Sequence, residues 1–371
     1  MQRDEAADRQ RPLFHILPRG MTFSRDGASS IDLFVSEVAA HSRFPIEIVA
    51  EFRAPALPAK VLHPLPAYPF AEGWRRARFV AALARARDPR LLIVQQHLPS
   101  AAAIGRRVAQ PILLQRHNFL RPPRPGWLGG FARARHARQL QALAGITFVS
   151  EAARDDFERD WPEVATPRWI VPNGVECSQW RPSADREPLV LVVGRATPEK
   201  GLLEAAQALA ATLPGHPGWG SAFVVSGAER GADYLRQVRE ALAPLQARAR
   251  VFVEIPYAEV KALNERAAIS LIPSKWREPF GRTCLEALAG GAAVVTSGTG
   301  GLREIGGDAA LYVPDAEPAR LAEALGALMS DASLRERLSH EGRTRTEALF
   351  DLPRVARRLD DACAAILARA K

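Results

Sequence analysis

Cysteine is scarce in this sequence, and long hydrophobic runs are absent. The 371 residues include three cysteines, Cys177, Cys284 and Cys363, which lie far apart and lack metal-ligand spacing. We therefore expect reduced thiols, and the pattern argues against a disulfide-stapled fold or a cysteine-based metal site. No apolar run approaches the roughly 18 to 20 residues that span a bilayer, and the polar stretch MQRDEAADRQRP lacks the apolar core of a secretory signal. These absences predict a cytoplasmic protein.

Positive charge is concentrated in the first half of the chain, whose net charge is +9 overall. Residues 1–180 contain 25 basic and 17 acidic residues, a net of +8, whereas residues 181–371 contain 25 and 24, a net of +1. A basic half favours an anionic partner. Because the arginines do not alternate with aromatics in a nucleic-acid-binding pattern, no nucleic-acid partner is expected. An anionic membrane surface or an anionic acceptor fits better.

Short apolar runs alternate with helix-like segments along the whole chain, which is typical of α/β proteins with parallel sheets. The polar segment 181–188 contains two prolines and is predicted to be a linker. We expect a Rossmann-like domain over residues 1–180, a second over residues 189–351, and a helix over 352–371 that packs back toward the first domain. Two such domains would face each other across a cleft, with ligands beyond the carboxyl ends of the strands. The strands expected in the second domain are 189–194, 222–226, 251–254, 269–273, 293–296 and 310–313.

A turn with two cations follows the first expected strand of the second domain. Its sequence, Gly194-RATPEKGL, brings backbone N–H donors, Arg195 and Lys200 to the start of a helix. Such a turn can hold a diphosphate, although it lacks the residue order of a P-loop. Taken alone, an ordinary surface turn is an equally good interpretation, because arginine and lysine are common in such turns.

Two carboxylates eight positions apart, Glu278 and Glu286, flank the sequence PFG. Pro279 and Gly281 disfavour a helix through Glu278. Glu278 is therefore predicted on a loop, and Glu286 on a helix that opens at residues 280–283. Free N–H groups at that helix start attract phosphate, and the carboxylates can accept hydrogen bonds from sugar hydroxyls. Because the neighbours of Glu286 are apolar, we expect it to have a partner.

Three segments, Leu191-VVGRATPEKGL, Ile272-PSKWREPFGRTCLEALAGGAAVV and Gly300-GLREI, together resemble family 4 of the retaining glycosyltransferases, which have the GT-B fold. The resemblance covers the second domain closely and the first domain loosely. It implies that Glu278 binds hydroxyls of the donor sugar, that Glu286 binds the ribose, and that Arg195 and Lys200 neutralise the diphosphate. The remaining donor-binding residues that it implies are Gly194, Pro279, Phe280, Gly281, Arg282 and Thr283.

In the first domain, Ile93-VQQHLPSA looks like the strand-end histidine of the family, which meets the donor sugar near the reacting carbon. The resemblance carries that role onto His97, and a structural or merely exposed histidine is the alternative. The segment Gln115-RHNF offers Arg116, His117 and Asn118 either as acceptor-binding residues or as ordinary loop polar residues.

The loop at Gly27 and Ala28 stands where the family has a Gly-Gly turn that approaches the donor phosphate. Here only Gly27 is glycine, so this departure leaves the contact with phosphate open. Ser29 and Ser30 follow as candidate caps of a helix.

The resemblance implies a retaining hexosyltransferase that moves a sugar from a nucleoside-diphosphate sugar to a hydroxyl of a glycan or glycolipid, in cell-envelope polysaccharide or lipopolysaccharide synthesis. UDP is favoured slightly over GDP on family frequency. No Asp-x-Asp pair follows a strand, so no metal or other cofactor is expected, and cations would stabilise the leaving diphosphate. Two rivals stay open: a catalytically silent nucleotide-sugar-binding protein, which Ala28 favours, and a nucleotide-sugar hydrolase or epimerase.

Two segments combine tryptophan and phenylalanine with dense arginine, Trp74-RRARFVAALARAR and Gly126-WLGGFARARHARQL. One interpretation is an interfacial patch that docks on anionic lipid and meets a lipid-linked acceptor, which would place the protein at the periphery of the inner membrane. The other, slightly favoured, is a pair of packed amphipathic helices whose outer faces are rich in arginine.

Overall fold

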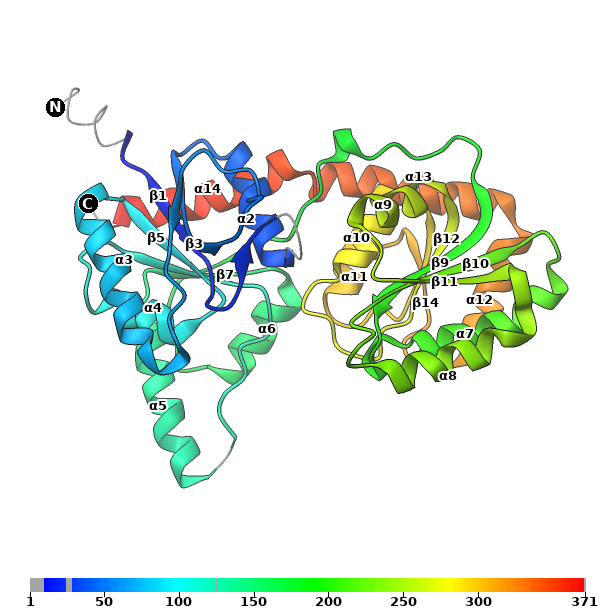
Figure 1. The fold of residues 1–371 in the computed structure, drawn as a ribbon, viewed down its shortest axis with the longest axis horizontal. Helices are drawn as coiled ribbons and strands as arrows, with labels where there is room; N and C mark the ends of the chain where they lie inside the picture. The colour runs from blue at the N-terminus through cyan, green and yellow to red at the C-terminus, as the bar shows by residue number, and fades with distance from the viewer. Residues whose placement is uncertain (1–9, 25–28, 125, 370–371) are drawn as a thin grey trace. The chain divides into compact units, whose positions relative to one another are not determined.

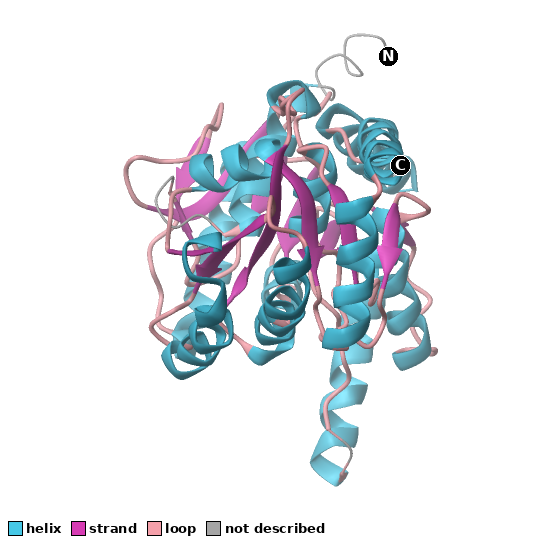
Figure 2. Cartoon of the chain, turned by 90° about the vertical axis from the view of Figure 1, so that its right-hand side faces the viewer, coloured by secondary structure: helices cyan, strands magenta, loops and turns pink. Residues whose placement is uncertain are grey.

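The computed structural model describes residues 10–24, 29–124 and 126–369, and the chain divides into two compact units. Unit 1 comprises residues 1–173 and 352–371, and unit 2 comprises residues 174–351. Each unit is built on a parallel sheet with helices on both faces, which confirms the expected α/β class (Figures 1 and 2). No helix among the described residues is long and apolar enough to cross a membrane.

The boundary between the units differs from the predicted one at residue 180. Residues after Asn173 already pack in unit 2, where Val175 N donates to Phe350 O at 3.0 Å and Cys177 N donates to Asp351 at 3.0 Å. The segment 181–188 is also not a free linker, because Ser183 N bonds to a carbonyl of unit 2 and strand β9 begins at Glu187. Its two prolines and polar composition mark an exposed but fixed segment.

The sheet of unit 1 has the order β2-β3-β1-β5-β6-β7-β8, with β4 paired to β3, and all described pairs are parallel. Its strands are β1 (Leu13–Ile16), β2 (Thr22–Phe23), β3 (Ile46–Phe52), β4 (Leu62–Pro64), β5 (Leu91–Gln95), β6 (Ile112–Arg116), β7 (Gly145–Phe148) and β8 (Arg168–Ile170). Successive strand residues enter two different cores because side chains alternate between the faces of a sheet.

Helices cover both faces of this sheet. One face packs against α2 (Ser30–His41) and α14 (Leu352–Arg369). The other packs against α3 (Gly73–Arg87), α4 (Leu98–Gly105), α5 (Trp127–Gln141) and α6 (Glu151–Asp160). The last helix of the chain therefore belongs to unit 1, where Asp360 accepts hydrogen bonds from Ser42 Oγ at 2.7 Å and Arg43 N at 2.8 Å.

The sheet of unit 2 has the order β11-β10-β9-β12-β13-β14. Its strands are β9 (Glu187–Arg195), β10 (Gly220–Ser226), β11 (Ala249–Val253), β12 (Ala267–Ile272), β13 (Ala293–Thr296) and β14 (Ala310–Tyr312). Its helices are α7 (Leu202–Thr212), α8 (Ala232–Leu242), α9 (Tyr257–Arg266), α10 (Arg282–Ala289), α11 (Gly301–Gly306), α12 (Pro318–Ser330) and α13 (Ala332–Leu349). All six predicted strands of this unit are confirmed to within three residues at each end.

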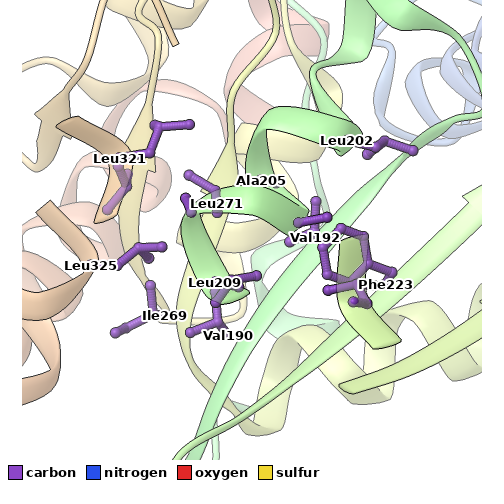
Figure 3. Packing of buried hydrophobic residues seen from close by; sticks show 14 of the residues in the cluster. Val190, Val192, Leu202, Ala205, Leu209, Phe223, Ile269, Leu271, Leu321 and Leu325 are labelled. Carbon is purple, nitrogen blue, oxygen red and sulfur yellow. The ribbon is translucent and has the colours of Figure 1, made fainter. Parts of the chain in front are cut away.

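The main core of unit 2 lies between the sheet and helices α7 and α12 (Figure 3). Val190 and Val192 of β9 pack with Ile269 and Leu271 of β12 against Leu209 of α7, and all five are buried. These central strands are apolar on both faces because both faces are covered, which is the usual condition of a parallel sheet. The rigid sheet fixes the positions of the loops at its carboxyl edge.

Candidate functional site

The strand order of the sheet in unit 2 changes direction at β9. From β9 the chain adds β10 and β11 on one side, then returns to add β12, β13 and β14 on the other. In open parallel sheets such a switch point leaves a crevice at the carboxyl ends of the two central strands, where ligands bind. The two predicted motifs follow β9 and β12, so both reach this point.

Lys200 and Glu278 meet at the switch point. Lys200 Nζ lies 2.5 Å from Glu278 Oε1, and Ser274 Oγ donates to the same oxygen at 2.8 Å. Glu278 is 8% exposed, so its carboxylate is nearly buried against one cation and one hydroxyl. Among the described residues no hydrogen bond engages its Oε2 atom. The site therefore presents one free carboxylate oxygen beside an ammonium group.

The loop that carries Glu278 is braced by the start of α11. Gly301 N donates to Glu278 O at 2.9 Å. A Cβ on Gly301 would lie 2.7 Å from Phe280 Cα, and one on Gly300 would lie 2.2 Å from Glu278 O. Only glycine permits this approach, and it holds the main chain of Glu278 in place. Phe280 is buried with its ring 6.0 Å from that of Phe350, so its backbone alone is available to a ligand.

Helix α10 begins at Arg282, with Gly281 as its N-cap at φ +119°, as the sequence predicted for residues 280–283. Glu286 lies on this helix and is 5% exposed. Its Oε1 accepts hydrogen bonds from Arg282 Nε at 2.9 Å and from the Tyr257 hydroxyl at 3.0 Å. The expectation that Glu286 has a partner is confirmed.

Tyr257, at the start of α9, was missed as a site residue. Burial raises the pKa of its hydroxyl, and the Glu286 carboxylate raises it further, so the phenol stays protonated and donates. It lies in the segment Ile255-PYAEV, four positions after β11 ends at Val253. That position was the one available signal.

The two cations in the turn after β9, Arg195 and Lys200, differ in their exposure to solvent. Arg195 ends the strand and is exposed, whereas Lys200 is half-buried. Gly194 is half-buried, and a Cβ there would lie 3.2 Å from Leu202 and 3.4 Å from Lys200 Cβ. Arg195 is therefore available to solvent, and Lys200 is held by Glu278. The other predicted donor residues, Pro279 and Thr283, are half-buried at the same edge.

In unit 1, His97 follows β5 and is the N-cap of α4. Its Nδ1 accepts from Ser100 N at 3.2 Å and lies 2.8 Å from Ser100 Oγ. Burial lowers the pKa of His97, and the charges of Arg19, Arg76 and Arg116 lower it further. The imidazole is therefore neutral near pH 7 and half-buried. It caps a helix with one nitrogen, and its Nε2 forms no hydrogen bond with a described residue.

The side chains of Arg116 and His117 form hydrogen bonds with residues next to His97 and with Phe119. The Arg116 guanidinium donates to Gln96 O and to Phe119 O, and the residue is 6% exposed. His117 Nε2 pairs with Gln95 at 2.8 Å, and burial, with a smaller effect of Arg116, lowers its pKa to about 3. Both side chains make these hydrogen bonds within unit 1, and their role in an acceptor site stays a prediction.

Asn118 is the exposed member of the three predicted acceptor residues, and its Oδ1 accepts from Phe119 N at 3.2 Å. Gly27 and Ala28 lie outside the described residues. Ser29 caps α2 as predicted, with Oγ accepting from Asp32 N at 3.2 Å. Within residues 10–24, 29–124 and 126–369, no group of three or more His, Cys, Asp or Glu is placed to hold a metal ion.

A buried polar row that the sequence analysis missed lies behind His97. Gln95 Nε2 donates to Gln115 Oε1 at 3.0 Å and lies 3.2 Å from His15 Nδ1. All three residues are at most 1% exposed, and burial lowers the pKa of His15 to about 4. The row ties β1, β5 and β6 together beneath the loop that carries His97.

Comparison with known proteins agrees with this architecture. Residues 34–179 match the family described as Glycosyltransferase Family 4, and residues 178–345 match Glycosyl transferases group 1. A glycogen synthase of Mycobacterium tuberculosis is 33% identical over 243 residues, which cover 62% of this chain and 57% of that protein. An alpha-maltose-1-phosphate synthase of the same organism is 30% identical over 272 residues, covering 63% of this chain and 68% of that protein.

Solved structures share the fold over nearly the whole chain. Sucrose-phosphate synthase from Thermosynechococcus elongatus superposes with a TM-score of 0.76 at 18% identity, covering 97% of this chain and 100% of that one. The Anabaena protein HepE, solved in complex with UDP and glucose, gives 0.74 at 15% identity and covers 95% and 99%. The expected GT-B fold is confirmed. The chain covers little more than half the length of the glycogen synthase that it matches.

Proposed function

Because this chain belongs to family 4 of the glycosyltransferases, we propose that it transfers a sugar from a nucleoside-diphosphate sugar to an acceptor hydroxyl, with retention of configuration. The observation that supports this best is the pairing of Lys200 with Glu278 at the switch point of unit 2, with Glu286 on the adjacent helix. A cation for phosphate and two carboxylates for hydroxyl groups lie within one edge of one sheet.

The donor would bind through complementary charge and hydrogen bonds. Lys200 and the exposed Arg195 neutralise the diphosphate, and the free N–H groups at the start of α10 add dipoles of the same sign. Glu278 accepts from hydroxyls of the sugar through its unengaged oxygen. Glu286, fixed by Arg282 and Tyr257, accepts from the ribose. In this arrangement the diphosphate needs no bound metal.

The reaction would depend on stabilising the leaving group. As the bond from the anomeric carbon to the diphosphate lengthens, negative charge grows on the phosphate oxygen that Lys200 and Arg195 face. The acceptor hydroxyl attacks from the same side, and its proton passes to the departing oxygen. The role of His97 toward the transferred sugar is proposed from the family resemblance alone, and its neutral imidazole, whose Nε2 forms no hydrogen bond with a described residue, suits that role. No covalent sugar–enzyme intermediate is part of this route, in contrast to retaining glycosidases.

The sugar and the acceptor are proposed from the relatives and from the charge of the chain. The names glycogen synthase, alpha-maltose-1-phosphate synthase and sucrose-phosphate synthase favour glucose as the sugar, and the UDP complex of HepE favours UDP as its carrier. A glucan or a sugar phosphate is then one acceptor class. The basic first half of the chain also suits an anionic, lipid-linked glycan of the cell envelope.

The proposal is tested by measuring release of nucleoside diphosphate from UDP-, ADP- and GDP-glucose, with and without glycogen, glucose 1-phosphate or a lipid-linked acceptor. We expect acceptor-dependent release that persists in EDTA, and a product whose anomeric proton coupling matches that of the donor. Release without acceptor dependence would indicate a hydrolase, and a thermal shift without release would indicate a silent binding protein. An inverted product would contradict retention.

Glu278→Gln provides the variant test of the site. The amide keeps the shape of the side chain but loses its charge, and Lys200 becomes free to bind phosphate. We expect nucleoside-diphosphate affinity to hold or to rise, while the transfer rate falls by about 100-fold. Glu204→Gln is the matched control, since it breaks a partly exposed ion pair between Glu204 of α7 and Lys275. A rate unchanged in Glu278→Gln would overturn the role of that carboxylate.

A further inference from the structure

The start of α5 exposes two large aromatic side chains. Trp127 is 77% exposed and Phe131 is 73% exposed, and their rings contact edge to face with centroids 6.5 Å apart. They lie four positions apart on one helix, so they form one continuous apolar surface, which we call the aromatic tip. Figure 1 shows the beginning of α5 extending away from the sheet of unit 1. Contiguous exposed apolar surface of this kind normally marks an interaction site.

The helix behind the aromatic tip is basic. Its 15 residues include Arg133, Arg135 and Arg138 and contain no aspartate or glutamate. Arg133 is paired with Glu163 at 2.9 Å. Within the described ranges, neither Arg135 nor Arg138 forms an ion pair, and the same holds for the exposed Arg124 before the helix. Uncompensated positive charge therefore surrounds the aromatic tip.

Helix α3 repeats the pattern. Trp74 is 47% exposed at its first turn, and the guanidinium carbons of Arg75 and Arg78 lie 5.3 and 5.7 Å from its ring. Arg75 also pairs with Glu72, whereas α3 itself has no acidic residue. Helices that connect parallel strands run opposite to them, so α3, α4 and α5 all begin at the carboxyl edge of the sheet. His97, the N-cap of α4, lies at that same edge.

We propose that the aromatic tip of α5 inserts into the interface of an anionic phospholipid bilayer, with the arginines of α5 on the lipid phosphates. Tryptophan prefers the headgroup boundary, phenylalanine is typical of the apolar face of interfacial helices, and arginine is attracted to an anionic surface. A second protein is a poorer occupant. Two aromatic side chains supply at most about 500 Å², below the roughly 800 Å² that each partner of a stable complex buries.

This docking does not depend on glycosyl transfer, so it is tested without an assay of activity. The full chain is sedimented with vesicles of phosphatidylglycerol and phosphatidylcholine, and separately with pure phosphatidylcholine. We expect binding to the anionic vesicles only, weakening at least about tenfold between about 50 and 300 mM salt. Trp127→Ala with Phe131→Ala should weaken it by about tenfold or more, and Arg135→Glu with Arg138→Glu should do the same.

Matched controls test whether position matters or only composition. Phe52→Ala removes another exposed aromatic, and Arg357→Glu with Arg358→Glu changes exposed charges on α14, which covers the other face of the sheet. Both should leave vesicle binding unchanged. Equal binding to neutral vesicles, or undiminished binding of the double aromatic variant, would overturn the proposal. So would a concentration-dependent dimer that Trp127→Ala with Phe131→Ala abolishes, since the occupant would then be a second copy.

Discussion

At the scale of single residues, the carboxylate of Glu286 is held by two donors that come from different places in the chain. Arg282 lies four positions away on the same helix, whereas Tyr257 lies 29 positions away at the start of α9. Both bond to Oε1, which fixes the side chain and leaves Oε2 for a ligand. A buried carboxylate that is fixed in this way loses little further entropy on binding.

We expect Tyr257→Phe to weaken binding of a nucleoside diphosphate. Phenylalanine keeps the ring but removes the hydroxyl that donates to Glu286 at 3.0 Å. A hydrogen bond to a charged group contributes about 1.5 to 3 kcal/mol, and part of it is lost by exposure of the site, so a fall in affinity of about tenfold is expected. Titration calorimetry with UDP measures it.

Tyr312→Phe is the control for this prediction. Its hydroxyl donates to Gly307 O at 2.7 Å, within the same unit but on another loop. It should lower the free energy of unfolding while the affinity for UDP stays the same. An equal loss of affinity in both variants would show that Tyr257 acts through stability alone.

The placement of three site residues in unit 2 was predictable from the sequence. Glu278, Glu286 and Lys200 stand in local motifs whose order along the chain predicts a common edge, and unit 2 brings them to that edge. Tyr257 was not predictable as the partner of Glu286, since their contact depends on how α9 packs beside α10. The hydrogen bonds of Arg116 were not predictable for a similar reason, because nothing local shows that its guanidinium turns inward to Gln96.

At the scale of elements, the loop of Glu278 depends on the start of α11. The two lie so close that a Cβ on Gly301 would lie 2.7 Å from both Cα and O of Phe280. The contact is between main chains, which cannot be relieved by a change of rotamer. A small residue at one helix start thus sets the position of a carboxylate on another loop.

Gly301→Ala is expected to lower the free energy of unfolding by about 1 to 3 kcal/mol, because the added methyl group must displace the backbone of Phe280. The affinity for UDP should fall with it, since the Glu278 loop and the start of α10 move together. Chemical denaturation and calorimetry measure the two effects.

The control is Gly326→Ala, on α12. A Cβ there would have its nearest contact at 3.8 Å, so alanine should stabilise the helix by about 0.5 to 1 kcal/mol and leave UDP binding unaltered. If Gly301→Ala, like Gly326→Ala, leaves UDP affinity unchanged and does not lower the free energy of unfolding, the contact between α11 and the Glu278 loop does not position the binding site.

Elements differ in how far the sequence predicts them. The strands of unit 2 are continuous apolar runs between turn signals, so all six were predicted. Strands β2 and β4 were not, because they contain only two and three residues and take their form from pairing with β3. The hydrogen bonds among the buried His15, Gln95 and Gln115 were not predicted either. The three residues lie on different strands, and the local sequence does not show which polar side chains will meet.

At the scale of the whole molecule, the chain completes unit 1 only with its last helix. Leu359 and Cys363 of α14 enter the same core as Val35 and Ile48 of the first fifty residues. Residues 174–351, which form unit 2, separate these partners in the sequence. The predicted boundary at residue 180 was late because proline and polar residues in 181–188 resemble a linker, although tertiary bonds fix them to unit 2.

Leu359→Ala tests this division. The side chain is 2% exposed, so its truncation should cost about 2 to 4 kcal/mol. Amide hydrogen exchange should rise in β1, β3 and α2 of unit 1, while the strands of unit 2 keep their protection. Leu325→Ala, at a buried position of α12, should give the reverse pattern. Faster exchange in both units of either variant would show that they unfold as one.

The return of α14 to unit 1 has a consequence for synthesis. Synthesis runs from the N-terminus, so the strands of unit 1 and α2 are made before α14, and unit 2 is made between them as one unbroken stretch. Unit 2 can therefore reach its native state first. Until α14 has been synthesised, the core that it shares with α2 and the sheet of unit 1 stays incomplete, and apolar residues such as Val35 and Ile48 lack their α14 partners.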